Sequence, residues 1–143
     1  MHSSLIQPYL FFSGRCDEAL AFYQTAIGAK VETVMSYSES PDPPPPGVLP
    51  PGFENKVMHS AFRVGESLVL ASDGCTPEVG FQGFSLALQV ADCDTAQRYY
   101  AALSAGGKAN MPLAPTFWSP SFGMLTDRFG VDWMVMVVPC DAK

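Results

Sequence analysis

The chain has 143 residues, 48% apolar and 15% charged, a composition that indicates one folded domain and excludes general disorder. Its formal net charge of −6 argues against a nucleic-acid binder and against anionic membranes, and favours a neutral or cationic small-molecule partner. No apolar run reaches the ~20 residues of a membrane span, and residues 1–4 lack the basic segment of a signal peptide, so we expect a cytoplasmic protein.

The first half of the chain predicts a strand, a helix and then three strands. The helix is the clearest element, because Ala19, Leu20, Tyr23 and Ala26 recur at spacings of three and four residues and form one apolar face. Gly28 supplies its C-terminal stop. In chain order, the elements are expected at residues 5–12, 16–27, 29–37, 56–64 and 67–72, the last two joined by a tight turn.

A proline-rich loop at residues 40–52 interrupts this series. It holds 7 of the chain's 13 prolines, and the run at residues 43–46 favours an extended polyproline conformation. One interpretation is a solvated excursion between two strands. The other is a lid or a dimer arm over a binding site, since long irregular loops in compact domains are often functional.

The second half predicts the same succession of elements. Asp92 is a good N-cap for its helix, and two glycines after Ala105 end that helix. Alternation in the last strand places Trp133 on the helix-packed side, in the core. The expected elements are a strand at 83–90, a helix at 93–105 and strands at 108–113, 122–126 and 131–138.

The two halves repeat in sequence as well as in pattern. Cys16, Asp17, Ala19 and Tyr23 recur at Cys93, Asp94, Ala96 and Tyr100, an offset of 77 residues (93 − 16). The hairpin glycines Gly65 and Gly130 lie 65 apart, and the difference of 12 (77 − 65) is close to the length of the proline-rich loop. We therefore predict an α+β fold and a single domain, 1–143, built of two βαβββ modules at about 5–74 and 83–139. The modules form a curved mixed sheet around a cavity, with the helices on its outer face.

The four cysteines are far apart in the sequence and form no Cys-x-x-Cys pair, so we expect free thiols. Cys16 and Cys93 open the two predicted helices, where the helix dipole lowers a thiol pKa. The aspartate that follows each of them opposes thiolate formation. A packing role is therefore favoured over a reactive one.

Segments spread over essentially the whole chain carry a resemblance to a known superfamily. They are residues 8–9, 19–23, 28–29, 57–61, 72–73 and, most specifically, the run from Thr116 to Met134. These residues resemble the vicinal oxygen chelate superfamily of glyoxalases, bleomycin-resistance proteins and extradiol dioxygenases, and within it the PhnB-like branch. The resemblance implies the paired βαβββ fold and a homodimer.

The PhnB-like branch also carries a demethylubiquinone methyltransferase-like label. A nucleotide-like methyl donor lies over a glycine-rich turn between a strand and a helix. This chain contains no Gly-x-Gly, and we do not take the label as a guide to its function.

Enzymes of the superfamily hold a divalent metal ion through His, Glu or Gln on the first and last strands of each module. The resemblance carries those positions onto Pro8, Val69, Ser85 and Met134, none of which is a His or a carboxylate. Divalent sites in proteins need several such ligands that converge. We expect no metal ion and no other cofactor.

Strand alternation predicts the face that lines the cavity. It places Leu10, Phe12, Ala87, Gln89, Asp132, Met134 and Met136 beside the former metal positions, a mostly apolar surface that suits an aromatic or amphipathic ligand. Phe117 and Trp118 lie in a loop that either closes the mouth of the cavity or packs in the core or a dimer interface.

His59 and Asp73 are the remaining polar candidates. His59 is either a ligand contact or a core histidine, and Asp73 either contacts ligand or caps a turn. We predict a protein that binds a small aromatic or cationic molecule without a metal ion, and whether it catalyses a reaction stays open. The predicted ligand-binding residues are His59, Asp73, Gln89, Phe117, Trp118 and Met134. The alternative is a metal-dependent lyase, isomerase or dioxygenase-type enzyme that uses ligands such as Gln7, His59 or Asp73.

Overall fold

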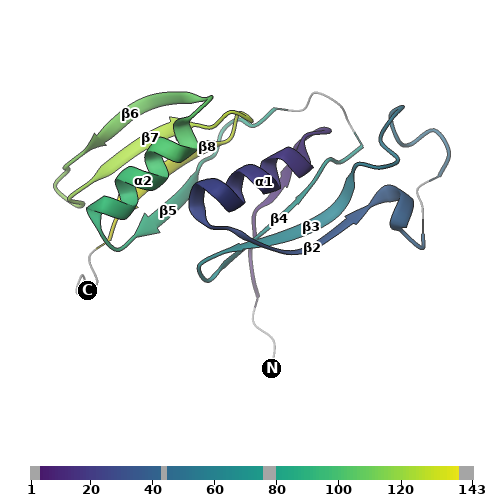
Figure 1. Cartoon of the computed structure of the whole chain (residues 1–143), viewed down its shortest axis with the longest axis horizontal. Coiled ribbons are helices and arrows are strands. Elements are labelled where there is room, and N and C mark those ends of the chain that lie inside the picture. The colour runs from purple at the N-terminus through teal and green to yellow at the C-terminus, as the bar shows by residue number, and fades with distance from the viewer. Residues whose placement is uncertain (1–3, 43–44, 76–79, 139–143) are drawn as a thin grey trace. The chain divides into compact units, whose positions relative to one another are not determined.

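The computed structural model describes residues 4–42, 45–75 and 80–138, and the chain forms two compact units, Met1–Val79 and Gly80–Lys143. Each unit has the predicted element order βαβββ (Figure 1). The first contains β1 (Tyr9–Phe11), α1 (Cys16–Ile27), β2 (Lys30–Ser36), a 3-10 turn η1 (Tyr37–Glu39), β3 (Val57–Val64) and β4 (Ser67–Ser72). The second contains β5 (Leu86–Val90), α2 (Cys93–Ser104), β6 (Lys108–Ala114), β7 (Phe122–Thr126) and β8 (Asp132–Val137).

The two sheets have the same topology. Their strand orders are β1-β4-β3-β2 and β5-β8-β7-β6, which coincide when the second unit is aligned on the first. In each sheet the first strand runs parallel to the last, and the other neighbours are antiparallel. A parallel neighbour requires a long crossover, and the helix is part of it. The predicted duplication of a βαβββ module is therefore confirmed.

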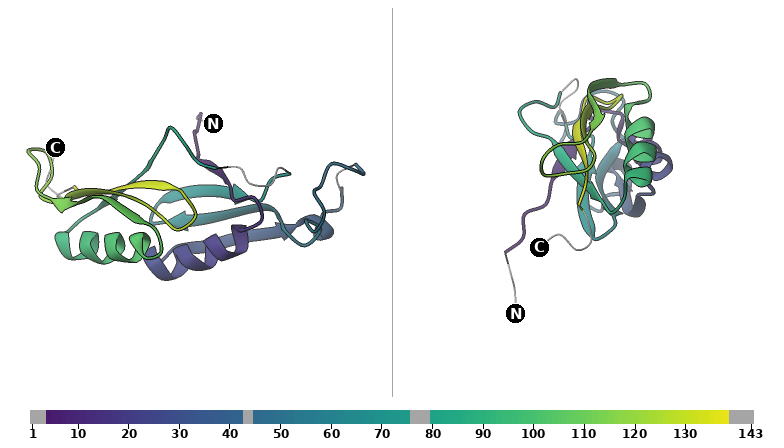
Figure 2. Two further views of the ribbon diagram at one scale, coloured as in Figure 1. Left: turned by 90° about the horizontal axis from the view of Figure 1, so that it is seen from above. Right: turned by 90° about the vertical axis from the view of Figure 1, so that its left-hand side faces the viewer.

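Each helix covers one face of its own sheet, as the views of Figure 2 show. The repeated sequence motif explains how. Ala19 and Ala96 are both fully buried, and their small side chains let each helix approach its strands closely. The repeated tyrosines reach the sheet: the Tyr23 ring stacks on Phe62 with 5.7 Å between centroids. The Tyr100 hydroxyl donates to carbonyl oxygens on β6 and β7, each at 2.9 Å.

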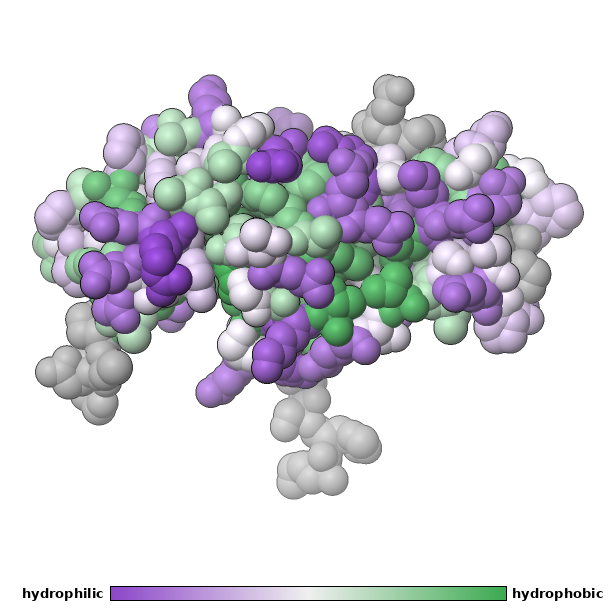
Figure 3. Space-filling view, viewed as in Figure 1, coloured by the Kyte–Doolittle hydropathy of each residue, from purple (hydrophilic) through white to green (hydrophobic). Residues whose placement is uncertain are grey.

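The helix ends follow the sequence signals. Gly28 ends α1 in the left-handed region, with φ of 68°. The Asp92 side chain accepts a hydrogen bond from the Thr95 N–H at 2.7 Å and so caps α2, as predicted. Hydrophilic side chains gather over the outer surface of α2 in Figure 3. None of the helices in the described ranges is long and apolar enough to cross a membrane.

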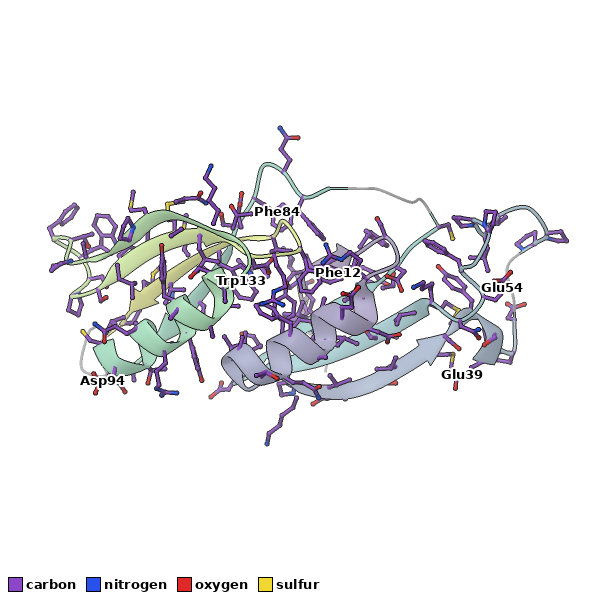
Figure 4. All side chains as sticks on the ribbon, turned by 45° about the horizontal axis from the view of Figure 1, so that its top comes forward. Phe12, Glu39, Glu54, Phe84, Asp94 and Trp133 are labelled. Atoms are coloured by element: carbon purple, nitrogen blue, oxygen red, sulfur yellow. The ribbon has the colours of Figure 1, made fainter. Side chains whose placement is uncertain are left out.

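The core of the second unit lies between α2 and its sheet. Leu103, Leu125 and Val135 are fully buried there, and Trp133 is 4% exposed, which confirms its predicted place in the core. Trp133 lies close to α2 in Figure 4. Its indole N–H donates to Asp127 Oδ2 at 2.9 Å, so the one polar atom of this large side chain is paired inside the core.

Several strands are shorter than predicted. The first begins at Tyr9 instead of Leu5, and Leu5 and Ile6 are 74% and 97% exposed. The fifth begins at Leu86 instead of Gly83. Apolar character alone extended both strands in the prediction, whereas strand pairing sets their real ends. In the proline-rich loop, residues 45–52 form turns without helix or strand, and Pro43 and Pro44 lie outside the described residues.

Candidate functional site

The side of each sheet away from its helix is the surface on which the cavity residues were predicted. In β8 the two sides are distinct: Trp133, Val135 and Val137 are buried toward α2, while the alternate residues are only partly buried. Cross-strand partners lie on the same side of a sheet, so the pairing of β8 with β5 and β7 identifies the rest of this open side.

Methionines dominate the open side of the second sheet. Met134 pairs with Met124 on β7 and with Ala87 on β5, and Met124 pairs in turn with Met111 on β6. Met136 pairs with Gln89 and Phe122. We call this surface the methionine face; it consists of Ala87, Gln89, Met111, Phe122, Met124, Met134 and Met136. The predicted placement of Ala87, Gln89, Asp132, Met134 and Met136 on one side of the sheet is confirmed.

An aromatic cluster adjoins one end of the methionine face. The rings of Trp118 and Phe122 meet edge to face with centroids 5.4 Å apart, and Phe117 meets Trp118 in the same way at 4.9 Å. Phe117 is 97% exposed and Trp118 is 55% exposed. Both residues therefore lie at the surface, as a loop position allows, and not in the core of this unit.

The loop that presents these rings is firmly anchored. The Thr116 N–H donates to the Ser119 carbonyl oxygen at 2.8 Å, and the Ser119 N–H donates to Thr116 Oγ1 at 3.0 Å. The buried Ser119 hydroxyl lies 2.9 Å from the carbonyl oxygen of Val137 on β8. The exposed rings thus project from a turn whose backbone is tied to the sheet.

A chain of polar side chains marks the other end of the same surface. Asn110 Nδ2 donates to Thr126 Oγ1 at 2.8 Å, and the Thr126 hydroxyl donates to Asp132 Oδ1 at 2.6 Å. Thr126 and Asp132 pair directly across β7 and β8. Asp132 lies two residues before Met134 on β8, on the same side of the sheet.

The open side of the first sheet is aromatic. Tyr9 and Phe11 lie on it with ring centroids 4.9 Å apart, and they are 40% and 44% exposed. His59 lies beside Tyr9, with 6.2 Å between the ring centroids. His59 is therefore a partly exposed residue of this surface and not a fully buried core histidine.

Two residues assigned to the cavity by sequence do not lie there. Leu10 and Phe12 are 2% and 4% exposed and face α1. The Phe12 ring lies 6.2 Å from the Tyr23 ring of that helix, and Phe12 lies close to α1 in Figure 4. Val69 also faces α1, since it pairs with Phe62. Tyr9 and Phe11 hold the positions that the prediction gave to Leu10 and Phe12.

One additional residue before α1 causes this error. From Phe11, the last strand residue on the open side, to Cys16 is five residues (16 − 11), whereas from Gln89 to Cys93 is four (93 − 89). Ser13 and Gly14 form the longer connection, with φ of 55° and 105°. The prediction used the same number of residues between strand and helix in both modules. Because side chains in a strand alternate with period two, the one additional residue assigned the side chains of the first strand to the wrong face.

Asp73 has a structural position, which removes it from the ligand-binding set. It is 1% exposed, and its Oδ1 accepts hydrogen bonds from the Gly14 N–H at 2.7 Å and the Cys16 N–H at 2.8 Å. Its Oδ2 accepts from the Val57 N–H at 2.8 Å. The carboxylate satisfies backbone donors and has no accessible oxygen for a ligand, so the turn-capping interpretation is the correct one.

Cys16 is a buried packing residue. Its thiol lies 3.8 Å from the Ser60 hydroxyl in the core under α1. Burial raises the pKa of Cys16 from 9.0 to about 12, outweighing the opposite effect of the hydrogen bond between Cys16 and Ser60, and the nearby Asp73 and Asp17 add to the rise. A neutral, buried thiol is a poor nucleophile, which agrees with the packing role. Cys75 and Cys93 are exposed free cysteines, and Cys140 lies outside the described residues.

The donor set does not fit a divalent metal ion. Of the positions carried over from metal-binding relatives, Val69 faces the core and Met134 offers a thioether in the methionine face. Within residues 4–42, 45–75 and 80–138, no three side chains of His, Cys, Asp or Glu come together to hold a metal ion. Asp73, one ligand of the alternative metal site, is engaged by three backbone N–H groups.

Sequence comparisons agree with this architecture. A profile of the family described as 3-demethylubiquinone-9 3-methyltransferase matches residues 4–136. The chain belongs to this family. Protein YjdN of Escherichia coli (strain K12) is 33% identical to this PhnB-like chain over 139 residues, which cover 93% of the chain and 95% of YjdN.

Solved structures show the same fold. Protein PA1353 from Pseudomonas aeruginosa is 40% identical with a TM-score of 0.83, covering 96% of this chain and 99% of its own. A PhnB protein from Bacillus cereus is 24% identical with a TM-score of 0.78, covering 94% and 100%. The fosfomycin resistance protein FosX from Listeria monocytogenes, 12% identical with a TM-score of 0.64, covers 99% and 98%. This PhnB-like protein therefore has the fold of the vicinal oxygen chelate superfamily.

The strand–helix junction of the first module is not free to hold a nucleotide-like methyl donor. The N–H groups of Gly14 and Cys16, at the start of α1, both donate to the Asp73 carboxylate. A helix N-terminus binds ligands through such N–H groups when they are unpaired. This junction therefore offers no binding site for the methyl donor that the family's description as a methyltransferase would require.

The prediction missed part of the candidate surface. Gln89, Phe117, Trp118 and Met134 come together in the second unit, on or beside the methionine face. Met111, Met124 and Phe122 were not predicted, although Phe122 and Met124 alternate on β7 as their strand requires. Met111 follows a register shift between β6 and β7, which alternation alone does not reveal.

Proposed function

We propose that this PhnB-like protein binds a small aromatic or cationic molecule, without a metal ion, on the methionine face of its second unit. One observation carries the proposal: four methionines from three adjacent strands lie on the same side of the sheet, next to the ring of Phe122. A thioether is polarizable and its side chain is flexible, so methionines adapt to the outline of an apolar ligand.

The aromatic cluster supports this choice of ligand. Thioether–aromatic contacts contribute roughly 0.3–1.5 kcal/mol each, so a ring placed over several methionines is stabilised at more than one point. Phe117 and Trp118 extend the surface with rings that are 97% and 55% exposed. Their anchored turn is already ordered, which lowers the conformational entropy lost on binding.

We further propose that the protein acts as a homodimer. The open side of the first sheet exposes Tyr9 and Phe11, and the chain also exposes Leu5 and Ile6. Soluble proteins rarely leave such apolar residues grouped and wet. A second copy of the chain would cover this surface, and the small molecule would bind on the methionine face.

A thermal-shift screen with aromatic ligands, run in EDTA and in Zn²⁺, Ni²⁺ or Mn²⁺, tests the binding function. We expect aromatic ligands to raise the melting temperature in EDTA, and calorimetry then gives their Kd. The Met134→Ala variant should bind the same ligand at least fivefold more weakly, because the ligand loses a central contact. The matched control is Met58→Ala. Met58 lies on β3 in the first unit and is not part of the methionine face.

Unchanged affinity in Met134→Ala would contradict a site on the methionine face. A saturable rise in melting temperature with one equivalent of metal ion would contradict metal-free binding.

A further inference from the structure

We infer that the ligand carries a cationic, hydrogen-bond-donating group, such as an ammonium, and that Asp132 binds this group while the methionine face binds the apolar part. This inference rests on the proposed function and assigns the chemical class of its ligand. It comes from the geometry at the polar end of the methionine face.

The hydrogen bonds across the sheet have one direction. The Asn110 amide can only donate through its nitrogen, so Thr126 Oγ1 accepts there at 2.8 Å and its hydrogen is directed to Asp132 Oδ1 at 2.6 Å. Both donors in this series of hydrogen bonds, the Asn110 amide and the Thr126 hydroxyl, therefore point toward the Asp132 carboxylate. Asp132 is its accepting end, held in one orientation by a short hydrogen bond on one oxygen.

Within the described residues, the second oxygen of Asp132 accepts no hydrogen bond, and the residue is only partly buried. Asp132 forms no ion pair with any residue of the described ranges; the pairs Arg15–Glu18 and Arg63–Glu32 lie in the first unit. Lys108 pairs with Thr126 in the strand register but makes no ion pair with Asp132 in the described structure. Asp127, the neighbouring acid, is 3% exposed and accepts the Trp133 indole N–H.

The spacing along β8 sets the shape of the ligand. Asp132 and Met134 are two residues apart on the same side of the strand, which is roughly 7 Å at about 3.3 Å per residue. Met136 lies a further two residues on, opposite Phe122 and the aromatic cluster. A cation joined to an aromatic ring by a short alkyl chain matches this order, with the charge on Asp132 and the ring over the methionines.

Three indoles with the same ring and different end groups test the inference: tryptamine, tryptophol and indole-3-propionate. We expect the full-length protein to bind tryptamine about threefold to tenfold more tightly than tryptophol, as a partly exposed charge-assisted hydrogen bond allows. Indole-3-propionate should bind most weakly, because its carboxylate meets Asp132. Calorimetry at a fixed low salt concentration gives the three values of Kd.

Asp132→Asn removes the charge and keeps an oxygen that can accept the Thr126 hydroxyl. It should bring the three Kd values together while the Kd for tryptophol stays within twofold of wild type. Asp94→Asn is the matched control: it makes the same change in the same unit, on α2, which covers the opposite side of the sheet. It should leave the order of affinities unchanged.

The outcomes separate the two proposals. Equal binding of all three indoles by the wild-type protein overturns the role of Asp132 but leaves the aromatic site intact. The same tryptamine preference in Asp132→Asn as in wild type also overturns that role. No binding of any indole at millimolar concentration overturns the aromatic site, and the inference with it.

Discussion

Two buried aspartates hold the turns of this protein together, one in each unit. Asp73 joins the β1–α1 connection to the first residue of β3, because its carboxylate accepts from Gly14, Cys16 and Val57. Asp127 closes the β7–β8 turn in a similar way, accepting from the N–H groups of Phe129 and Val131. A carboxylate that accepts several backbone hydrogen bonds replaces the water that these donors lose on folding.

The Asp73 carboxylate should contribute strongly to the stability of the fold. Asp73→Ala leaves three backbone N–H groups without their acceptor, two of them fully buried, and should lower the free energy of unfolding by about 3–5 kcal/mol. Asp73→Asn keeps one acceptor oxygen and should lose less. Guanidinium chloride unfolding measures both.

Glu66→Gln, an exposed change in the β3–β4 turn, is the control and should stay within about 0.5 kcal/mol of wild type. A loss below about 1 kcal/mol in Asp73→Ala would show that water satisfies these donors and that the aspartate is dispensable for the fold.

The helices and sheets meet at positions where no larger side chain fits. Gly123 on β7 faces α2, and a Cβ there would lie 2.9 Å from Tyr100 Cε2 and 2.9 Å from the Met111 carbonyl oxygen. Tyr100 cannot retreat freely, because its hydroxyl donates to the backbone of β6 and β7. The tyrosine repeated in both helices therefore requires, in the second unit, a residue without a side chain beneath it.

Gly123→Ala should accordingly destabilise the protein by about 1–3 kcal/mol, since the added methyl group forces either the ring or the β6 backbone to move. The same substitution at Gly80, where nothing lies within 4 Å of the added Cβ, should change the stability little. Urea unfolding of the two variants provides the comparison. Equal midpoints would mean that α2 shifts without cost.

Most elements could be predicted from the sequence because their signals are local. The bounds of α1 follow from the spacing of its apolar residues and from Gly28, and β4 and β7 also begin and end as predicted. The face of β1 could not be predicted, since it depends on one additional residue in the connection formed by Ser13 and Gly14. The surroundings of Asp73 depend on contacts up to 59 residues away, which no local pattern contains.

At the scale of the whole molecule, the two units share a topology but not a surface. Both have the strand order of a βαβββ module with a helix on one face. Their open sides differ: Tyr9, Phe11 and His59 on the first, methionines on the second. Packing against a helix constrains the buried side of both sheets alike, while the open sides are free to differ, which suits two separate roles.

The proposed homodimer can be tested on the whole protein. We expect light scattering at micromolar concentration to give twice the 15.4 kDa of the chain. Phe11→Lys places a charge on the open side of the first sheet and should shift the mass toward one chain. Tyr37→Phe, which only removes a hydroxyl donating to the Gly74 carbonyl oxygen, should remain dimeric. A wild-type monomer would refute the assembly.

The only two tryptophans of the chain both belong to the second unit, and they stand in opposite surroundings. Trp133 is enclosed in the core beside α2, whereas Trp118 is 55% exposed beside the methionine face. Their fluorescence therefore separates into a blue-shifted emission that reports folding and a red-shifted emission that reports events at the surface. With Trp118→Phe as the reference spectrum, the protein carries its own optical probe for each side of one sheet.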